Sequence, residues 1–370
     1  MQSPPPARRR RVAVVGTGFM GTVHTRAARR AGADVVAVVG RTLASARRFA
    51  EQHGVPAYFD SVESMLADSG AEAVHVCTPN DMHAEHVQTV LKARLPVVCE
   101  KPLATTAADA QRLLSEADAA GVVHVVPFVY RFYPMVRELR SRLARGEGGR
   151  ISLLHGGYLQ DWLAGSSDTN WRVDAATGGA SRAFADIGIH WCDLAEFVTG
   201  QRISKLTAMT SIVPAARTAD GAPVTTEDIA AVLFQTDHGS AGTLKISQVS
   251  VGRKNQLQLF VDAEAGSYGF DQEHPDQLWA GGVEASTVIE RGNQVMAAAA
   301  ARYSRIPAGH PQGYQDCFDS LALDAYAAMD GEQVDGLPTF DDGVRSARLT
   351  EAVLTSARTG AWVDVDPTGK

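Results

Sequence analysis

The chain has 370 residues, of which 45% are hydrophobic, and a formal net charge of -7. A single hydrophobic core rarely grows beyond about 250–300 residues, so we expect two domains. The net negative charge disfavours nucleic acid as a partner, because phosphate backbones are bound by basic surfaces. No apolar run approaches the ~18–20 residues that cross a membrane, so we expect no membrane association.

The N-terminal residues 1–10 are rich in proline and then arginine. Such a run is typical of a disordered tail rather than of a signal peptide, because the apolar run behind it is short and ends in glycine. The four cysteines have no metal-like spacing and read as buried free thiols in a reducing compartment. We therefore expect a cytoplasmic protein.

Residues 11–16 form a short apolar run, and residues 17–31 have the pattern of a helix. Between them Gly16-Thr17-Gly18-Phe19-Met20-Gly21 has the G-x-G-x-x-G spacing in the strand–turn–helix context of a dinucleotide-binding fingerprint. Gly16 allows the tight turn, Gly18 the approach of a pyrophosphate, and Gly21 close packing of the helix on the strand. The alternative is a glycine-rich turn without a ligand. Because βαβ alternation follows, we count Gly16, Gly18, Phe19, Met20 and Gly21 as cofactor-binding.

The expected second strand, residues 34–39, ends in Gly40-Arg41-Thr42. An NAD-binding fold usually has Asp or Glu at this point, where it binds the ribose 2′-hydroxyl. Here Arg41 and Thr42 offer a cation and a hydroxyl suited to a 2′-phosphate, which favours NADP over NAD. The alternative is a solvated arginine over the adenine ring.

Two later strand ends complete the expected cofactor site, since ligands of open α/β sheets bind at the carboxyl ends of the strands. Residues 73–77 lead into Thr78, Pro79 and Asn80, and residues 95–99 lead into Glu100-Lys101-Pro102. The Lys101–Pro102 bond is a candidate for the cis form. His83 joins the cofactor-binding group. It stands three residues before His86, but no third ligand lies nearby, so no metal site is predicted.

The second half changes character, because long strand-like runs with hairpin spacing dominate it. They predict a mostly antiparallel sheet. We expect strands near residues 151–159, 203–212, 229–235, 242–251, 256–261 and 267–270, and helices over 312–329 and 341–358. The predicted fold is α/β, with a dinucleotide-binding domain at residues 11–128 and a substrate-binding and oligomerisation domain at residues 129–370. The C-terminal helix could pack back on the first domain.

One helix interrupts the strands and carries Asp186 and His190. Residues four apart lie on the same face of an α-helix, so both side chains can point into one cleft. A histidine near its ordinary pKa can take a hydroxyl proton, and a neighbouring carboxylate can orient it or the substrate. The alternative is a helix-capping aspartate beside a core histidine.

The motifs Gly16–Gly21, Cys99–Pro102, Asp186–His190 and Asp342–Glu351 together resemble the glucose–fructose oxidoreductase, inositol dehydrogenase and rhizopine-catabolism (Gfo/Idh/MocA) family. The resemblance covers nearly the whole chain and keeps the motifs in order. It implies a Rossmann domain followed by an α/β domain with a large open, mostly antiparallel sheet that forms homodimers or homotetramers. It also implies that Lys101, Asp186 and His190 are catalytic and bind the substrate.

The segments Tyr158–Trp162 and Asn170–Arg172 are similar to those of family members that act on anhydrosugars and cyclic polyols. Tryptophan faces pack on sugar C–H surfaces, while amide, guanidinium and phenol groups bind hydroxyls. The predicted substrate-binding residues therefore also include Tyr133, Gln160, Trp171 and Arg172, with ordinary packing between domains as the alternative.

Three functions fit these features. The first is an NAD(P)-dependent dehydrogenase that interconverts a secondary alcohol and a ketone on a sugar, anhydrosugar or inositol-like polyol. The second is an NAD-dependent glycosidase that oxidises its substrate transiently, and the third is a sensor or repressor that binds NAD(P). The Lys101, Asp186 and His190 set argues against the sensor.

Overall fold

The computed structural model describes residues 9–366, apart from 166, 167, 169, 214–217, 220, 221 and 293–295. Most of the expected tail, residues 1–8, lies outside the described residues. The described end of that segment is held in place, because Arg9 pairs with Asp34 at 3.3 Å and Arg10 pairs with Asp330. None of the described helices is long and apolar enough to span a membrane.

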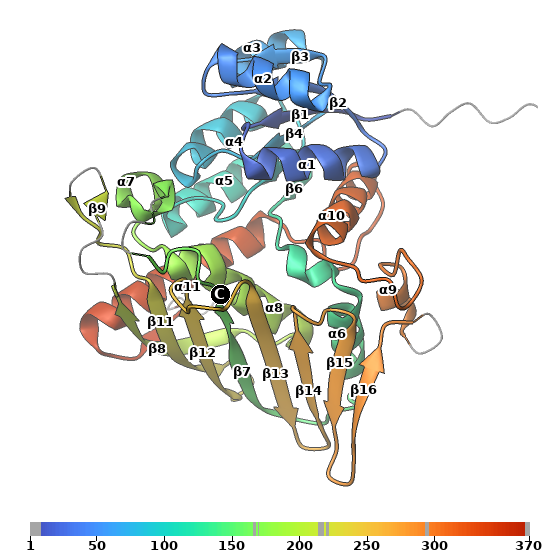
Figure 1. Cartoon of the computed structure of the whole chain (residues 1–370), viewed down its shortest axis with the longest axis vertical. Helices are drawn as coiled ribbons and strands as arrows, with labels where there is room; N and C mark the ends of the chain where they lie inside the picture. The colour runs from blue at the N-terminus through green and yellow to red at the C-terminus, as the bar shows by residue number, and fades with distance from the viewer. Residues whose placement is uncertain are drawn as a thin grey trace, which may run out of the picture.

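Two sheets organise the chain, one in each half of Figure 1. The first is a parallel six-stranded sheet in the order β3-β2-β1-β4-β5-β6. Its strands are β1 (Arg11–Val15), β2 (Asp34–Val39), β3 (Ala57–Phe59), β4 (Ala73–Val76), β5 (Val97–Cys99) and β6 (His124–Val125). This order is that of the doubly wound dinucleotide-binding fold, and it reverses direction between β1 and β4. The reversal opens a crevice at the carboxyl ends of these strands.

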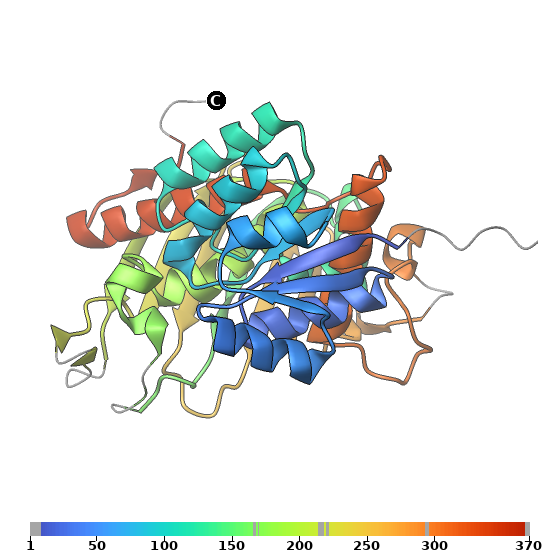
Figure 2. The ribbon, with the colours of Figure 1, turned by 90° about the horizontal axis from the view of Figure 1, so that it is seen from above.

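The strands of this sheet read as continuous apolar runs because helices cover both of its faces. The helices are α1 (Phe19–Arg30), α2 (Leu43–His53), α3 (Val62–Asp68), α4 (His83–Lys92) and α5 (Ala107–Ala120), with a 3₁₀ turn η1 (Asn80–Met82) before α4. Figure 2 shows the cyan and teal α4 and α5 on one side of the sheet and the darker blue α1 on the other. β1, for example, is buried from Val12 to Val15.

The second sheet has nine strands in the order β16-β15-β14-β13-β7-β12-β11-β8-β17. Its strands are β7 (Ile151–Leu159), β8 (Ile203–Ser211), β11 (Ile229–Thr236), β12 (Ala241–Ser247), β13 (Gln256–Ala263), β14 (Ser267–Asp271), β15 (Gln277–Gly281), β16 (Ser286–Glu290) and β17 (Val363–Asp364). All neighbours pair antiparallel except β7 and β12, which are parallel. The predicted fold class is confirmed. A separate two-stranded ribbon pairs β9 (Thr218–Ala219) with β10 (Ala222–Pro223).

The helices in the described part of the chain cover one face of this large sheet, which explains its alternating burial. In β11, Ala230, Val232 and Phe234 are buried, whereas Ala231 and Leu233 are exposed. The covering helices are α6 (Pro134–Ala144), α8 (Ile189–Thr199) and α11 (Phe340–Thr359). Alternation of this kind is expected where one face packs on a core and the other stays open.

The last two long helices reach back to the first sheet's layer. Helix α10 (Tyr314–Met329) packs on α1, and α11 packs on α5. The remaining short elements are η2 (Val129–Phe132), η3 (Trp171–Val173), α7 (Ala175–Gly178), η4 (Phe184–Gly188) and α9 (Ala298–Ala301).

Three expectations about elements were wrong. The strand expected over 242–251 ends at Ser247. Strands β15, β16 and β17 were not expected from the sequence. The turn that contains Asp186 is a π-helix rather than an α-helix.

Candidate active site

The crevice at the carboxyl ends of the first sheet continues into a cavity of about 1080 Å³ that reaches the second sheet. Its first wall contains Gly16, Gly18 and the strand ends Thr78–Asn80 and Glu100–Lys101, and its opposite wall contains Asp186 and His190. A cavity lined from both sheets can hold a cofactor and a substrate side by side.

The glycine loop leaves room for a ligand because its own packing excludes side chains. Gly16 has a φ of 115°, and a Cβ there would lie 2.5 Å from the carbonyl oxygen of Cys77. A Cβ on Gly21 would lie 2.2 Å from the carbonyl oxygen of Gly16, so Gly21 serves the packing of α1 and does not line the cavity. The hydroxyl of Thr78 faces this region buried and without a partner among the described residues. These features fit a dinucleotide that supplies the missing contacts.

At the end of β2 the cavity lining contains Gly40, Arg41 and Ser45. A Cβ at Gly40 would lie 2.7 Å from both the amide nitrogen of Ala46 and Oγ of Ser45, which explains why no acid stands there. Thr42 lies outside the cavity lining, because its side chain caps α2 by accepting a hydrogen bond from the Ser45 amide at 3.2 Å.

His83 also lies behind the cavity wall rather than on it. It is fully buried, with Nδ1 2.8 Å from the carbonyl oxygen of Pro102 and Nε2 2.9 Å from that of Thr78. It therefore connects the loop after β4 to the loop after β5. The Lys101–Pro102 peptide bond in the second of these loops is cis, as expected.

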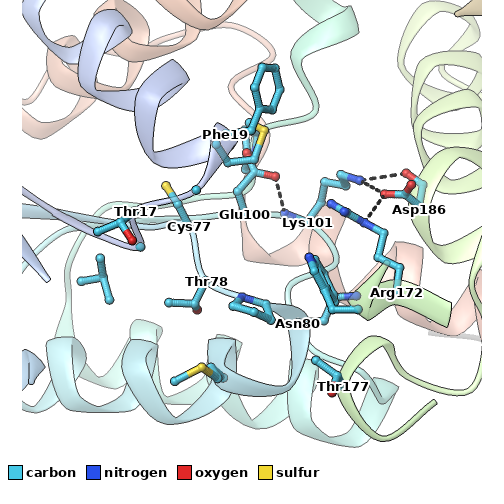
Figure 3. Close-up of a pocket in the computed structure, with 18 of the residues that line it drawn as sticks. Thr17, Phe19, Cys77, Thr78, Asn80, Glu100, Lys101, Arg172, Thr177 and Asp186 are labelled. Carbon is cyan, nitrogen blue, oxygen red and sulfur yellow. Dashed lines mark hydrogen bonds and ion pairs between the residues drawn. The ribbon is translucent and has the colours of Figure 1, made fainter. Parts of the chain in front are cut away.

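Lys101 and Asp186 meet across the cavity (Figure 3). Nζ of Lys101 donates to Oδ1 of Asp186 at 2.7 Å and to its carbonyl oxygen at 2.9 Å. Arg172 Nε lies 3.3 Å from the same Oδ1, and Gln248 Nε2 donates to Oδ2 at 2.8 Å. An ammonium group has three N–H donors, so one donor of Lys101 has no partner among the described residues and remains for a ligand.

These partners fix the charge of Asp186. Burial alone would raise the pKa of this carboxyl, but Lys101 and Arg172 outweigh that effect and hold the pKa below its ordinary value. Asp186 is therefore an anion at neutral pH that holds Lys101 and Arg172 in place.

His190 is mostly buried, and its Nδ1 has no hydrogen-bond partner among the described residues. Its ring meets those of Tyr130 and Phe128 edge to face, with centroids 5.0 and 5.8 Å apart. Burial and the positive charge of Lys101 hold the pKa of His190 well below its ordinary value of 6.5, although Asp186 acts in the opposite direction. A neutral imidazole at this position is able to accept a proton.

The local backbone explains how Asp186 and His190 come to share the cavity. Residues Phe184–Gly188 form a π-turn that runs into α8 without a break. A Cβ on Gly188 would lie 2.5 Å from the ring of Phe184, so the turn requires glycine there. Such π-turns are rare and occur often at functional sites.

Buried acids hold the start of this helix. Glu227 accepts hydrogen bonds from the Ser181 hydroxyl at 2.7 Å and from the Phe184 amide at 2.9 Å, and Asp228 pairs with the buried Arg182. Glu227 and Asp228 come directly before β11, so the second sheet anchors the Asp186–His190 segment.

Of the predicted substrate-binding residues, Gln160, Trp171 and Arg172 line the cavity with Lys101, Asp186 and His190. Tyr133 does not, because it is buried beside Tyr130, with ring centroids 6.0 Å apart, and its hydroxyl accepts a hydrogen bond from Gln272 at 3.3 Å. Gln248 contacts Asp186, and Tyr130, Tyr158, Trp162 and Asn255 line the cavity. The sequence analysis singled out the segment that holds Tyr158 and Trp162 but missed Tyr130, Gln248 and Asn255, which carry no motif. The one signal for Gln248 and Asn255 is their place, directly after β12 and directly before β13.

Comparison with known proteins agrees with this arrangement. Residues 10–128 match a family model described as "Oxidoreductase family, NAD-binding Rossmann fold", and residues 136–269 match one described as "GFO/IDH/MocA C-terminal domain". Levoglucosan dehydrogenase of Pseudarthrobacter phenanthrenivorans is 27% identical over an alignment that spans 96% of this chain and 97% of that protein.

Two solved structures show the same fold over nearly their full length. The oxidoreductase domain protein from Kribbella flavida is 30% identical with a TM-score of 0.89, covering 96% of this chain and 99% of that one. An inositol dehydrogenase homolog from Azotobacter vinelandii, complexed with NADH and myo-inositol, is 28% identical with a TM-score of 0.86, covering 97% and 98%. The chain therefore belongs to the Gfo/Idh/MocA family of NAD-binding oxidoreductases.

Proposed function

We propose that this protein is an NAD(P)-dependent dehydrogenase that interconverts a secondary alcohol and a ketone on a sugar, anhydrosugar or cyclic polyol. The observation that carries the proposal is the meeting of Lys101, Asp186 and His190 in the cavity that the glycine loop also lines. The names of the relatives, which include levoglucosan dehydrogenase and an inositol dehydrogenase homolog, support this substrate class.

A bound nicotinamide dinucleotide, for which Gly16, Gly18 and the loops after β4 and β5 are suited, supplies the hydride acceptor. The chain's own residues handle the proton and the charge. The free N–H of Lys101 donates to the substrate hydroxyl oxygen and stabilises the negative charge that develops on it. Neutral His190 takes the hydroxyl proton, and in the reverse direction it returns a proton to the ketone oxygen.

Asp186 has a positioning task in this scheme. Its carboxylate already accepts from Lys101 and Gln248 and pairs with Arg172, and its pKa is too low for it to serve as the base near neutral pH. It fixes the direction of the Lys101 ammonium and balances two cations in a buried site. Arg172 and Trp171, whose guanidinium and ring lie 4.3 Å apart, present a flat polar surface to a sugar hydroxyl.

We also propose that the cofactor is NADP in preference to NAD. The support is local: Gly40 admits no acid, and Arg41 and Ser45 line the cavity where the 2′ position of the ribose is expected. An arginine suits a phosphate because its N–H groups can bind two oxygens at once.

The open face of the second sheet supports a homodimer or homotetramer as the assembly. Met209, Leu233 and Trp279 are exposed on strands of this sheet, and exposed apolar patches on a flat sheet are typical of association surfaces. Light scattering of the wild-type chain and a Leu233→Glu variant would measure this; a wild-type monomer would contradict it.

We place the protein in the cytoplasm, with residues 11–128 as the cofactor domain and residues 129–370 as the substrate domain. The four buried free cysteines suit a reducing compartment.

The proposed activity is tested with purified protein, NAD and NADP, and a panel that contains levoglucosan, myo-inositol and common aldoses. Growth of the near-ultraviolet absorbance of reduced nicotinamide with one or more of these compounds is expected. Cofactor binding without turnover of any panel compound, in either direction, would contradict the proposal.

A further inference from the structure

Five side chains along the substrate wall of the cavity are joined by hydrogen bonds into one chain of contacts. The roles given above to Lys101, Asp186 and His190 do not account for it. All five line the cavity: Tyr130, Tyr158, Gln160, Trp162 and Asn255. Trp162 Nε1 lies 2.9 Å from Gln160 Oε1, Gln160 Nε2 lies 2.8 Å from Asn255 Oδ1, and the Tyr158 hydroxyl lies 2.6 Å from that same Oδ1. The Tyr130 and Tyr158 hydroxyls are in contact at the other end.

The chemistry of Trp162 sets the direction of the first half of this chain. An indole N–H can only donate, so the atom of Gln160 that faces it must be the amide oxygen. The amide nitrogen of Gln160 then faces Asn255, whose contacting atom must be its oxygen. The far side of Asn255 agrees, because its nitrogen lies 3.3 Å from Oε1 of Gln272.

The second half of the chain follows from counting protons. Tyr158 has one hydroxyl proton, and it donates that proton to Asn255 Oδ1. The contact between the two tyrosines must therefore use the proton of Tyr130. With its single proton committed, the Tyr130 oxygen offers only lone pairs to a ligand.

Burial keeps the hydroxyls of Tyr130 and Tyr158 protonated near neutral pH, as the count of their protons requires. It raises the pKa of Tyr130 to about 12 and the pKa of Tyr158 well above its ordinary value, so both hydroxyls stay protonated. Tyr130 and Tyr158 are both 3% exposed, so bulk water has little access to compete for these contacts. The Tyr130 ring also contacts His190, which places this acceptor beside the reacting group.

We infer that Trp162, through Gln160, Asn255 and Tyr158, makes Tyr130 an obligate hydrogen-bond acceptor, and that this wall selects substrates with a donating hydroxyl next to the oxidised carbon. The inference rests on the proposed function for its substrate class. A ligand with an ether, fluorine or carbonyl at that place can only accept a hydrogen bond, as can Tyr130. No hydrogen bond forms between them, and the ligand is rejected. A site built to bind a hydroxyl can reject an analogue that lacks it by several orders of magnitude, because a polar group stays unpaired.

Two substitutions change the donor–acceptor direction of these hydrogen bonds without removing Tyr130. In Trp162→Phe the fixed donor is lost, so the Gln160 amide can rotate and both directions become available. In Gln160→Glu the carboxylate can only accept, so Asn255 must turn its nitrogen toward residue 160 and Tyr158. Tyr158 then donates to Tyr130, and the proton of Tyr130 is free for the ligand.

The test compares a parent polyol with derivatives in which one non-reacting hydroxyl is replaced by fluorine, which is small and cannot donate. The probes are levoglucosan and myo-inositol with their singly fluorinated derivatives. We measure kcat/KM and, for enzyme with cofactor bound, the dissociation constant by fluorescence titration. At one position the wild-type enzyme is expected to prefer the hydroxyl by about 100-fold or more, and Trp162→Phe to reduce that preference by about 10-fold. Gln160→Glu is expected to abolish or reverse it.

The controls separate this effect from a general loss of the site. Trp362→Phe removes an exposed tryptophan that does not line the cavity and should leave the preference unchanged. Tyr130→Phe should lower the preference, and adding Gln160→Glu to it should then change nothing, as a double-mutant cycle requires of a path through Tyr130. An unchanged preference in both Trp162→Phe and Gln160→Glu overturns the inference.

The outcomes also separate this inference from the proposed function. If the parent compounds bind but are not oxidised, the proposed function fails. The ratio of the dissociation constants of the hydroxyl compound and its fluorinated derivative still decides whether the hydrogen-bonded side chains select a donating hydroxyl. If no parent compound binds, both are overturned.

Discussion

The Nζ atom of Lys101 lies 2.7 Å from Oδ1 of Asp186, although the two residues are 85 positions apart in the chain. Lys101 comes from the loop after β5 of the first sheet, and Asp186 comes from the π-turn that precedes α8. The contact therefore joins the cofactor side of the cavity to the substrate side (Figure 3). Lys101 also lies close enough to His190 to lower the pKa of that imidazole.

Replacing Lys101 with methionine should remove a contact that matters most in the transition state. We expect kcat to fall by at least ~10²-fold while cofactor affinity, measured by fluorescence titration, stays nearly unchanged. Lys92→Met, on the exposed end of α4, is the matched control and should behave as wild type. An equal loss of cofactor affinity in Lys101→Met would assign Lys101 to the cofactor site instead.

The pH profile of alcohol oxidation should report the depressed pKa of His190. The base must be neutral to accept a proton, so activity falls as pH drops through its pKa. Because burial and Lys101 lower that pKa, the acidic limb of kcat/KM is expected below pH 6.5. Lys101→Met removes one of these two causes, so its acidic limb should move to higher pH. A limb that stays in place in the variant would show that Lys101 does not act on the essential base.

Arg41→Ala should test the choice of cofactor. Loss of a phosphate-binding guanidinium is expected to weaken NADPH by about 10-fold or more and NADH by much less. Arg48→Ala removes an exposed arginine in the second turn of α2 that is not part of the cavity lining, and it should change neither affinity. Equal effects of Arg41→Ala on NADPH and NADH would rule out a 2′-phosphate contact.

Gly188→Ala should disturb the π-turn that presents Asp186 and His190. The added Cβ would lie 2.5 Å from the Phe184 ring, and overpacking of this kind costs about 1–3 kcal/mol. We expect a lower midpoint in urea unfolding and a loss of kcat greater than the loss of cofactor affinity. Gly200→Ala, at an αL position with open space around its Cα, controls for a general glycine effect on stability and should retain kcat.

The fold was predictable where a local sequence pattern is compatible with a single type of structure. The run before Gly16 and the spacing of the three glycines predicted the strand–turn–helix unit, and the six-stranded order follows from repeated βαβ units. Strands β15 and β16 were missed because they lie at the edge of the second sheet, where several residues of both strands are exposed and the apolar alternation is weak. β17 has two residues and forms only because β8 offers a free edge.

The site was predictable from motifs only in part, because several side chains near it contact backbone groups instead of lining the cavity. The hydroxyl of Thr42 caps α2, and the two ring nitrogens of His83 lie next to loop carbonyl oxygens, so neither residue lines the cavity. Nothing in the sequence around Gln248 shows that it reaches Asp186, since that contact depends on how β12 packs against the π-turn. Likewise, the direction of the hydrogen bonds that end at Tyr130 depends on side chains from separate loops.

Transfer of deuterium from a substrate labelled at the carbinol carbon distinguishes a dehydrogenase from an enzyme that oxidises its substrate only transiently. Levoglucosan or myo-inositol, whichever is oxidised, is deuterated at the carbon that becomes the ketone and incubated with stoichiometric cofactor. We expect one deuterium on the nicotinamide ring for each ketone formed, and a kcat that falls sharply in His190→Asn. Deuterium that returns to the sugar, with net hydrolysis and no accumulated reduced cofactor, would contradict a dehydrogenase.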